Sequence, residues 1–424
     1  MGRFVGPSMQ ATDPAESDLS YPQLGAVAND VMPFEFALPA QQPAAGKAEQ
    51  TPTIAAINWR LLKQSFANAT SDRIAAAEYF YARLFAVNPG IRSLFPTSMS
   101  EQRERMFTEL TRLIWSMDSE PACTEMLHQL GRGHRRFGVV EKHSTAFFGA
   151  LRDTIQLGLG SAWTPDIETA WCGAVDFFAA AMRAGAAAAS DSPAWWIGMI
   201  VGHELRSPGV AVLRLHTDKP LPYQAGQHVP VQVSRWPRTW RSYSVGTAPR
   251  PGGLLELHVR AVPGGLVSNT LVRHSAVGDS VLLGAAEGTM ALTDSDRDLL
   301  CLAGGTGLAP IKAIIEQAIA ADSGRDRPRT ITLFLGARQH FDLYDLEDLQ
   351  LLEASYEALR VIPVLSDQPG YPGLTGMLPE VVSSQGHVGD AEAYVCGPPA
   401  MVRQAVALLG GCIPASQIHF DPVP

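Results

Sequence analysis

Residues 299–321 read LLCLAGGTGLAPIKAIIEQAIAA, an apolar run followed by a glycine loop and then a helical pattern. A phosphate-binding loop needs this order, because backbone N–H groups at the start of a helix can hold an anion. The loop contains no Walker lysine, so hydrolysis of a nucleoside triphosphate is disfavoured. Pro310 also stands where a Rossmann GxGxxG motif would have its third glycine. The segment therefore predicts a nucleotide-binding region that lacks the standard Rossmann fingerprint.

The apolar residues on either side of this loop follow two different periods. Over 294–424, short buried strands alternate with helical segments, which predicts an α/β doubly wound domain with a parallel sheet. Over 194–293 the period is two. In LLELHVRAV (254–262), for example, Leu255 and Leu257 alternate with Glu256 and His258. This alternation between Gly/Pro turns predicts an antiparallel β-barrel.

The first part of the chain has another texture. Residues 54–190 carry only helical patterns and lead into AAAASDSPA (186–194), a plausible linker. Residues 1–53 are rich in Pro, Ala, Gln and Ser, and we expect a disordered tail there. The predicted chain is thus multidomain: an all-α domain, a β-barrel and an α/β domain follow the tail.

Composition narrows the class of protein. The 424 residues carry a formal net charge of −9 and an isoelectric point near 5.7, which argues against nucleic-acid binding. The five cysteines are widely spaced and form no CxxC pair, which suits a reducing cytosol. No apolar run approaches the roughly twenty residues of a membrane span, and no signal peptide is visible. We therefore expect a soluble, cytoplasmic protein.

Three polar residues fall on apolar helix faces in the all-α region. Tyr81 lies on a stripe that continues through a helix from Ser71 or Asp72 to Val87, with Ile74, Ala77, Leu84 and Phe85 as its other members. Gln102 lies one turn before Met106 on the next helix. On the third, Cys123, Leu127, Leu130 and His134 follow at i, i+4, i+7 and i+11, so His134 faces inward and His128 outward.

His134 has two interpretations. A lone histidine at a helix end is more often satisfied by the last carbonyls of the helix than bound to a metal. Three inward polar residues on three helices, Tyr81, Gln102 and His134, instead favour a shared interior ligand. Gly138 is expected to end the helix.

The segments around these residues resemble a bacterial globin over about 54–190. FYARLFAVNPGIRSLFP, EQRERMF and LHQLGRGHRRFGV look like its B helix and CD corner, its E helix and its F helix. The resemblance implies a haem b, with His134 as the proximal ligand to the iron and Phe95 packing on the haem. It also implies that Tyr81 and Gln102 form the distal pair that holds haem-bound oxygen.

Four short motifs follow in order along the rest of the chain. RSYSVG (241–246) offers Arg241, Tyr243 and Ser244, and a flavin needs a cation, an aromatic face and hydrogen bonds of this kind. HVRAVPGGLVSN (258–269) offers Arg260 and a glycine turn whose N–H groups can hold a pyrophosphate. AGGTGLAP and YVCGPPAM (394–401) complete the series.

This order resembles the ferredoxin–NADP reductase superfamily over about 195–424. The resemblance implies that the first two motifs bind FAD and the last two NAD(P)H. The implied FAD residues are His228, Arg241, Tyr243, Ser244, Arg260, Gly265, Val267 and Ser268. The implied nucleotide residues are Gly304, Gly305, Thr306, Gly307, Pro310, Cys396, Gly397 and Pro398. For Cys396, a buried structural role and a role near hydride transfer are equally open.

A globin ahead of such a reductase resembles a flavohaemoglobin. That resemblance implies an NAD(P)H-dependent enzyme that passes electrons through FAD to haem and oxidises nitric oxide to nitrate with O2. The partners implied are these small molecules, with no obligate protein partner. Two alternatives stay open: an FAD-linked oxidoreductase with another donor or acceptor that uses the globin as a relay, and a gas sensor kept ferrous by its reductase.

Four positions depart from the family pattern. By spacing, Ser144 and Ala188 stand where a proximal Tyr and Glu are usual, and His228 stands where a tyrosine near the flavin is common. Val423 replaces a C-terminal aromatic residue that shields the flavin. The sequence does not discriminate between NADH and NADPH, because Arg338 can meet a 2′-phosphate or stack on adenine.

Overall fold

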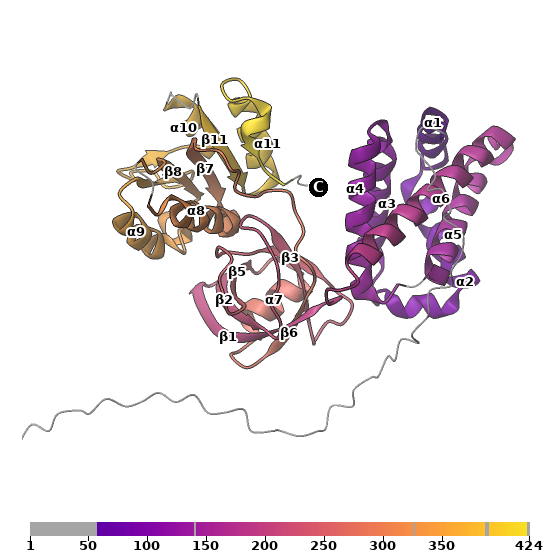
Figure 1. Ribbon diagram of the computed structural model, residues 1–424, viewed down its shortest axis with the longest axis horizontal. Helices are drawn as coiled ribbons and strands as arrows, with labels where there is room; N and C mark the ends of the chain where they lie inside the picture. The colour runs from indigo at the N-terminus through magenta and orange to yellow at the C-terminus, as the bar shows by residue number, and fades with distance from the viewer. Residues whose placement is uncertain (1–56, 140, 325–326, 386–389, 422–424) are drawn as a thin grey trace, which may run out of the picture. The chain divides into compact units, whose positions relative to one another are not determined.

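The computed structural model describes residues 57–421, apart from 140, 325–326 and 386–389. The expected tail, residues 1–53, and Val423 lie outside the described residues. Three kinds of architecture follow one another along the chain: helices, an antiparallel barrel and a parallel sheet with helices (Figure 1). The predicted fold class is confirmed.

Six α-helices make up the first region in the described residues. They are α1 (Trp59–Ala69), α2 (Arg73–Val87), α3 (Ser100–Trp115), α4 (Glu120–His134), α5 (Glu141–Leu159) and α6 (Pro165–Ala188). The Asp72 side chain starts α2 by accepting hydrogen bonds from the N–H groups of Ile74 and Ala75. A single core of mostly apolar side chains, including Phe80, Leu127 and Trp171, unites the helices.

The buried face of α2 differs from the predicted stripe. Ile74 is 74% exposed, whereas Phe80, which the stripe omitted, is fully buried. Because successive residues turn by about 100°, Phe80 moves the centre of the buried face to Ala77 and Leu84. Ile74 then lies about 80° from that centre and faces solvent.

Helices α4 and α6 lie against each other with their backbones in near contact. A Cβ atom added to Gly131 of α4 would lie 2.0 Å from the carbonyl oxygen of Met182. One added to Gly185 of α6 would lie 2.3 Å from the carbonyl oxygen of His128. The helix that ends at His134 is therefore held on α6 by two positions where only glycine fits.

Six strands form the barrel, in the order β4-β3-β6-β1-β2-β5. They are β1 (Trp196–Ser207), β2 (Val210–Thr217), β3 (His228–Val233), β4 (Arg241–Ser244), β5 (Leu254–Arg260) and β6 (Ser280–Leu283), with α7 (Leu266–Arg273) after β5. An antiparallel bridge between Val245 and Leu257 joins the two outer strands of this order. The alternation correctly predicted the inner residues Leu255 and Leu257. His258 on the opposite face is buried as well, however, because it contacts Tyr344 of the following domain.

The last region is a parallel sheet in the order β10-β9-β8-β7-β11-β12. Its strands are β7 (Asp298–Gly304), β8 (Ile331–Ala337), β9 (Leu359–Leu365), β10 (Leu374–Thr375), β11 (Ala391–Cys396) and β12 (Ile418–His419). Helices α8 (Leu308–Asp322) and α9 (Leu346–Ser355) pack on one face, and α10 (Leu378–Ser384) and α11 (Pro399–Leu409) on the other (Figure 1). Among the described helices, none combines the length and apolarity that crossing a membrane requires.

The contact between α4 and α6 leads to a stability prediction. Gly131→Ala should lower the free energy of unfolding of the helical region by about 1–3 kcal/mol, because its methyl group forces the two helices apart. Gly149→Ala on α5 is the matched control, since no atom lies within 4 Å of its added Cβ. Replacing this mid-helix glycine should stabilise by up to about 1 kcal/mol. Urea unfolding of both variants tests the pair, and equal effects would disprove the close-contact explanation.

Candidate cofactor sites

Tyr81, Gln102 and Phe95 come together from three segments of the helical region. The Tyr81 side chain on α2 is 2% exposed, and the Nε2 atom of Gln102 on α3 donates to its hydroxyl at 3.4 Å. The Tyr81 and Phe95 rings meet edge to face with centroids 5.6 Å apart. Burial raises the pKa of Tyr81 to about 12, so the phenol stays protonated and can donate a hydrogen bond.

His134 is the last residue of α4, and Gly138 ends the following turn with a φ of 67°. Its Nδ1 atom lies 2.6 Å from the carbonyl oxygen of Leu130, one turn back. A carbonyl only accepts, so Nδ1 carries the proton and Nε2 is the atom left with a lone pair. Burial lowers the pKa of His134, which favours the neutral imidazole that binds iron. The donor chemistry therefore fits a haem.

The direct hydrogen-bond partner of this imidazole is not acidic, although the charge of Glu287 acts to raise its pKa. The partner of Nδ1 is a backbone carbonyl rather than a carboxylate. Ser144 lies on α5, and Ala188 is the last residue of α6. By sequence spacing, two small side chains, not a Tyr and a Glu, stand at these positions on α5 and α6, and of the two helices α6 packs against α4.

Two arginines after His134 make contacts beyond the helical core. Arg135 donates to the carbonyl oxygens of Ala189 and Ser192, in the short segment between α6 and β1. Arg136 forms an ion pair with Glu287, with 2.6 Å between Nη1 and Oε1. The guanidinium group of Arg136 also lies over the ring of Trp240, 5.5 Å from its centroid. Sequence reasoning missed these contacts, because adjacent arginines at a helix end are usually solvent-exposed and give no sign of a distant partner.

The flavin motif lies on β4, which pairs antiparallel with β3. Arg241 faces Val231, Tyr243 faces Val229 and Ser244 faces His228. The structure thus places His228 beside the motif. Burial raises the pKa of Tyr243, so its hydroxyl stays protonated.

An acidic residue missed from sequence also reaches His228. The Oδ2 atom of Asp421 lies 3.5 Å from Nδ1 of His228, and its Oδ1 atom accepts from the N–H groups of Thr289 and Met290. Burial would raise the pKa of Asp421, but the hydrogen bonds from His228 and Thr289 outweigh it, so the net shift is downward. Gly288 makes room, because an added Cβ would lie 2.7 Å from Asp421.

The second flavin motif forms a closed turn between β5 and α7. Arg260 ends β5, and Gly265 is the residue before the first turn of α7. A Cβ added to Gly265 would lie 2.5 Å from Oγ of Ser268, a hydroxyl that accepts from the N–H of Val262 at 3.3 Å. Val267 points into the barrel core. The turn thus leaves the first N–H groups of α7 available for an anion, which fits a pyrophosphate.

The two nucleotide motifs meet at the carboxyl edge of the sheet. Parallel pairing of β7 with β11 sets Ala303 opposite Cys396. A Cβ added to Gly307 would lie 2.5 Å from the carbonyl oxygen of Cys396. A Cβ added to Gly304 would lie 2.9 Å from Cδ of Pro398, and one added to Gly397 would lie 3.1 Å from Cα of Gly304. The absence of side chains at these glycines therefore lets one motif pack on the other, whether or not a nucleotide is bound.

The remaining predicted nucleotide residues surround this contact. Gly305 and Thr306 form the short turn before α8, Pro310 is buried in its first turn, and Pro398 precedes α11. Gly305 has a φ of 55°, and Arg260 of the flavin motif is the only neighbour that its added Cβ would meet within 4 Å. Burial raises the pKa of Cys396 to about 12, so the thiol stays protonated.

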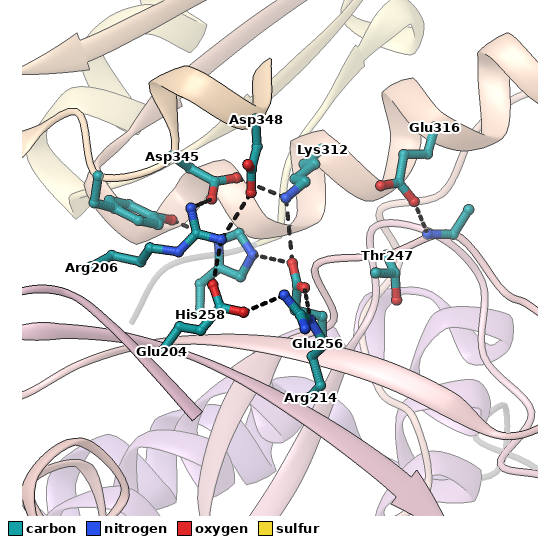
Figure 2. Close-up of polar contacts among 12 residues, drawn as sticks. Glu204, Arg206, Arg214, Thr247, Glu256, His258, Lys312, Glu316, Asp345 and Asp348 are labelled. Atoms are coloured by element: carbon teal, nitrogen blue, oxygen red, sulfur yellow. Dashed lines mark hydrogen bonds and ion pairs between the residues drawn. The ribbon is translucent and has the colours of Figure 1, made fainter. Parts of the chain in front are cut away.

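Side chains from the barrel and from the sheet domain form a charged cluster (Figure 2). Figure 2 shows Lys312 pointing from α8 toward Glu256 of β5, with Asp345 on its other side. Sequence reasoning missed the cluster, because a lysine in a helix and a glutamate in an alternating strand are normally exposed.

Family models cover all three regions. A globin model matches residues 78–182, an oxidoreductase FAD-binding domain matches 199–291, and an oxidoreductase NAD-binding domain matches 301–407.

Curated relatives match the reductase part. The chain is 37% identical over 192 residues to the xylene/toluene monooxygenase electron transfer component XylA of Pseudomonas putida, covering 44% of this chain and 53% of that protein. It is 36% identical over 214 residues to a ferredoxin–NAD(P)+ reductase component of the naphthalene 1,2-dioxygenase/salicylate 5-hydroxylase systems of a Ralstonia species, covering 49% and 63%. The chain thus spans 53% to 63% of the length of these two relatives.

Among solved structures, a flavohaemoglobin of Malassezia yamatoensis with bound FAD and haem has the same fold. The TM-score is 0.71 at 17% sequence identity, covering 86% of this chain and 97% of that one.

The distal residues yield a ligand-binding prediction. Tyr81→Phe should speed oxygen dissociation from the ferrous protein by about 10- to 150-fold, because a hydrogen bond to a partly charged ligand contributes about 1.5–3 kcal/mol. Tyr79→Phe is the matched control, since Tyr79 lies on the same helix and is 36% exposed. Stopped-flow displacement of oxygen measures both rates. An unchanged rate in Tyr81→Phe would remove Tyr81 from the distal role.

Proposed function

We propose that this chain, a globin joined to an FAD- and NAD-binding oxidoreductase module in the flavohaemoglobin architecture, is a nitric oxide dioxygenase driven by NAD(P)H. One hydride supplies two electrons, so one NAD(P)H balances the conversion of two NO and two O2 into two nitrate ions, NAD(P)+ and one proton. FAD, when bound, accepts an electron pair and passes electrons on singly, which is what haem iron requires.

The observation that carries the proposal is the pairing of Tyr81 and Gln102 in the same small domain as His134. His134 has one ring nitrogen engaged by Leu130 and the other left for iron. The Tyr81 hydroxyl is protonated and buried. It accepts from Nε2 of Gln102 and donates to the backbone carbonyl of Gln102, both at 3.4 Å, and a bound ligand would take the place of that long carbonyl contact. A donor of this kind stabilises negative charge on a small diatomic ligand.

Each motif residue has a proposed role in binding. Arg241, Tyr243, Ser244, Arg260, Gly265, Val267, Ser268 and His228 would hold FAD. Gly304, Gly305, Thr306, Gly307, Pro310, Cys396, Gly397 and Pro398 would hold NAD(P)H. Phe95 would pack on the haem.

The hydrogen bonding of His134 would set how strongly this chain donates electrons to the haem iron. A carboxylate that accepts from a haem histidine raises the basicity of the ligand, and a carbonyl does so less. Because Nδ1 of His134 bonds to the Leu130 carbonyl, we infer a weaker electron donation to iron than in a histidine paired with Glu. We expect the Tyr81–Gln102 pair to carry correspondingly more of the stabilisation.

Nitric oxide consumption tests the proposal. The purified chain with NADH or NADPH in air should consume NO and form one nitrate per NO. His134→Ala should lose haem and NO turnover while it keeps FAD and the oxidation of NAD(P)H by a dye. An NO electrode, nitrate analysis and absorbance spectra measure these quantities. Retained haem in His134→Ala would disprove the proximal assignment, and absent NO turnover in the intact chain would disprove the activity.

The relatives of the reductase part favour a second candidate. Their names describe components that pass electrons to separate oxygenases. This chain would then reduce an external one-electron acceptor through FAD. In that case His134→Ala would reduce a ferredoxin or cytochrome c as fast as the intact chain, and NO turnover by the intact chain would be slow.

A further inference from the structure

The charged cluster in Figure 2 lies between the flavin barrel and the nucleotide domain. The barrel contributes Glu204 and Arg206 from β1, Arg214 from β2, and Glu256 and His258 from β5. The nucleotide domain contributes Lys312 from α8, and Tyr344, Asp345 and Asp348 at the start of α9. The side chains of His258 and Asp345 are fully buried, and those of Glu256 and Lys312 are 12% and 11% exposed.

Lys312 is the centre of this cluster. Its Nζ atom lies 2.8 Å from Oδ2 of Asp345 in its own domain and 3.3 Å from Oε1 of Glu256 in the barrel. The same Glu256 oxygen lies 2.9 Å from Nε2 of His258, and Nδ1 of His258 lies 2.7 Å from the hydroxyl of Tyr344. The bonds therefore form a path that crosses from one domain to the other twice and whose two ends, Asp345 and Tyr344, are neighbours in the chain.

The buried groups of the cluster stay charged because each has a partner of opposite charge. Burial would raise the pKa of Glu256, but the hydrogen bond from His258 and the charge of Lys312 hold it at about 2. Burial would lower the pKa of Lys312, but Asp345 and Glu256 raise it. Both groups therefore stay ionised at neutral pH, and moving either domain would leave a buried charge without its partner.

The elements that carry the cluster also carry both cofactor motifs. Lys312 lies in the first turns of α8, which begins directly after the glycine loop. Glu316, one turn later on α8, accepts from the N–H of Ala248, just beyond the RSYSVG motif. Glu256 is four residues before Arg260 on β5. One helix thus connects the nucleotide loop to both flavin-binding segments.

We propose that Lys312, bridging Glu256 and Asp345, is a positioning residue for hydride transfer: it fixes the nucleotide loop against the flavin motifs. The proposal rests on the proposed function only as far as electron transfer from NAD(P)H to FAD. Hydride transfer requires the reacting atoms to approach to about 3–3.5 Å, and a misplacement of about 1 Å can cost about a hundredfold in rate. Val210 and Val212 of the barrel pack in the core of the nucleotide domain, so apolar contacts also join the two domains. Apolar contacts have no fixed direction, whereas paired charges also fix the orientation of the two surfaces.

The test separates positioning from stability by replacing the charges with neutral groups of similar size. K312M/E256Q/D345N removes all three charges together, a kind of change that is often neutral for folding. Arg206 and Arg214 lose one contact each but keep Glu204 as a partner. R329M/D322N is the matched control, because Arg329 and Asp322 form a buried ion pair within the nucleotide domain, at the far end of α8.

The readouts are anaerobic and need no nitric oxide. Rapid mixing with NADH should show flavin reduction slowed by about 10- to 100-fold in K312M/E256Q/D345N. The long-wavelength absorbance of nicotinamide stacked on flavin should weaken, and the isotope effect with 4-deuterated NADH should rise. The FAD content and KM for NADH should change less than the rate, and R329M/D322N should behave as the intact chain.

Three results are decisive. A K312M/E256Q/D345N chain with FAD bound, the wild-type rate and unchanged absorbance would overturn the positioning role. If that chain fails to retain FAD, E256Q alone decides, since the amide keeps its hydrogen bonds but loses the charge: a rate slowed at least threefold supports the proposal and an unchanged rate overturns it. Flavin in the intact chain that NAD(P)H does not reduce would instead contradict the proposed function.

Discussion

The nucleotide half of the chain depends on a backbone contact that admits no side chain, between Gly307 and the Cys396–Gly397 turn. This contact is possible because β7 and β11 are parallel neighbours, so their carboxyl ends meet at one edge of the sheet. It sets where α8 begins, and therefore where Lys312 and Glu316 stand one turn apart. The position of α8 in turn decides which barrel segments the nucleotide loop can reach.

Buried polar groups divide into two kinds in this molecule. In the cluster around Lys312, the bonds from Lys312 to Glu256 and from His258 to Tyr344 cross the domain boundary, and low dielectric surroundings make such pairing necessary. At the candidate haem site the pattern is different, since His134 has one nitrogen bonded and one open. The cluster around Lys312 is largely paired, apart from Oδ1 of Asp345 and Nε of Arg206, which have no hydrogen-bond partner. A mostly paired network suits a mechanical role, and an open lone pair suits a ligand.

Sequence patterns predicted the architecture because the three regions have different apolar periods. They predicted one buried face of α4, on which Cys123 and Leu127 are fully buried and Leu130 and His134 are half-buried. They failed for Ile74, where a single extra aromatic residue, Phe80, turned the buried face. Helical phase alone does not specify which neighbours cover a helix.

The candidate sites were accessible from sequence only where a motif is contiguous. His228 and Ser244 are sixteen residues apart in sequence but paired in the sheet, and family resemblance rather than periodicity linked them. Asp421, Glu287 and Lys312 carry no local signal, because their partners come from distant segments. Alternation correctly placed His258 on the outer face of the barrel. That face is buried at His258 because Tyr344 of the adjoining domain covers it.

The contact of Arg135 with the segment after α6 gives the fusion point a meaning of its own. Only residues 189–195 separate α6 from β1, and two of their carbonyls are bound by the residue that follows the candidate haem ligand. The linker between α6 and β1 is therefore not a free chain, because hydrogen bonds hold part of it against the helical region. Residues 189–192 are therefore tied to the helical region through the residue next to His134, and a cut that separates the two modules without breaking these bonds would fall after Ser192.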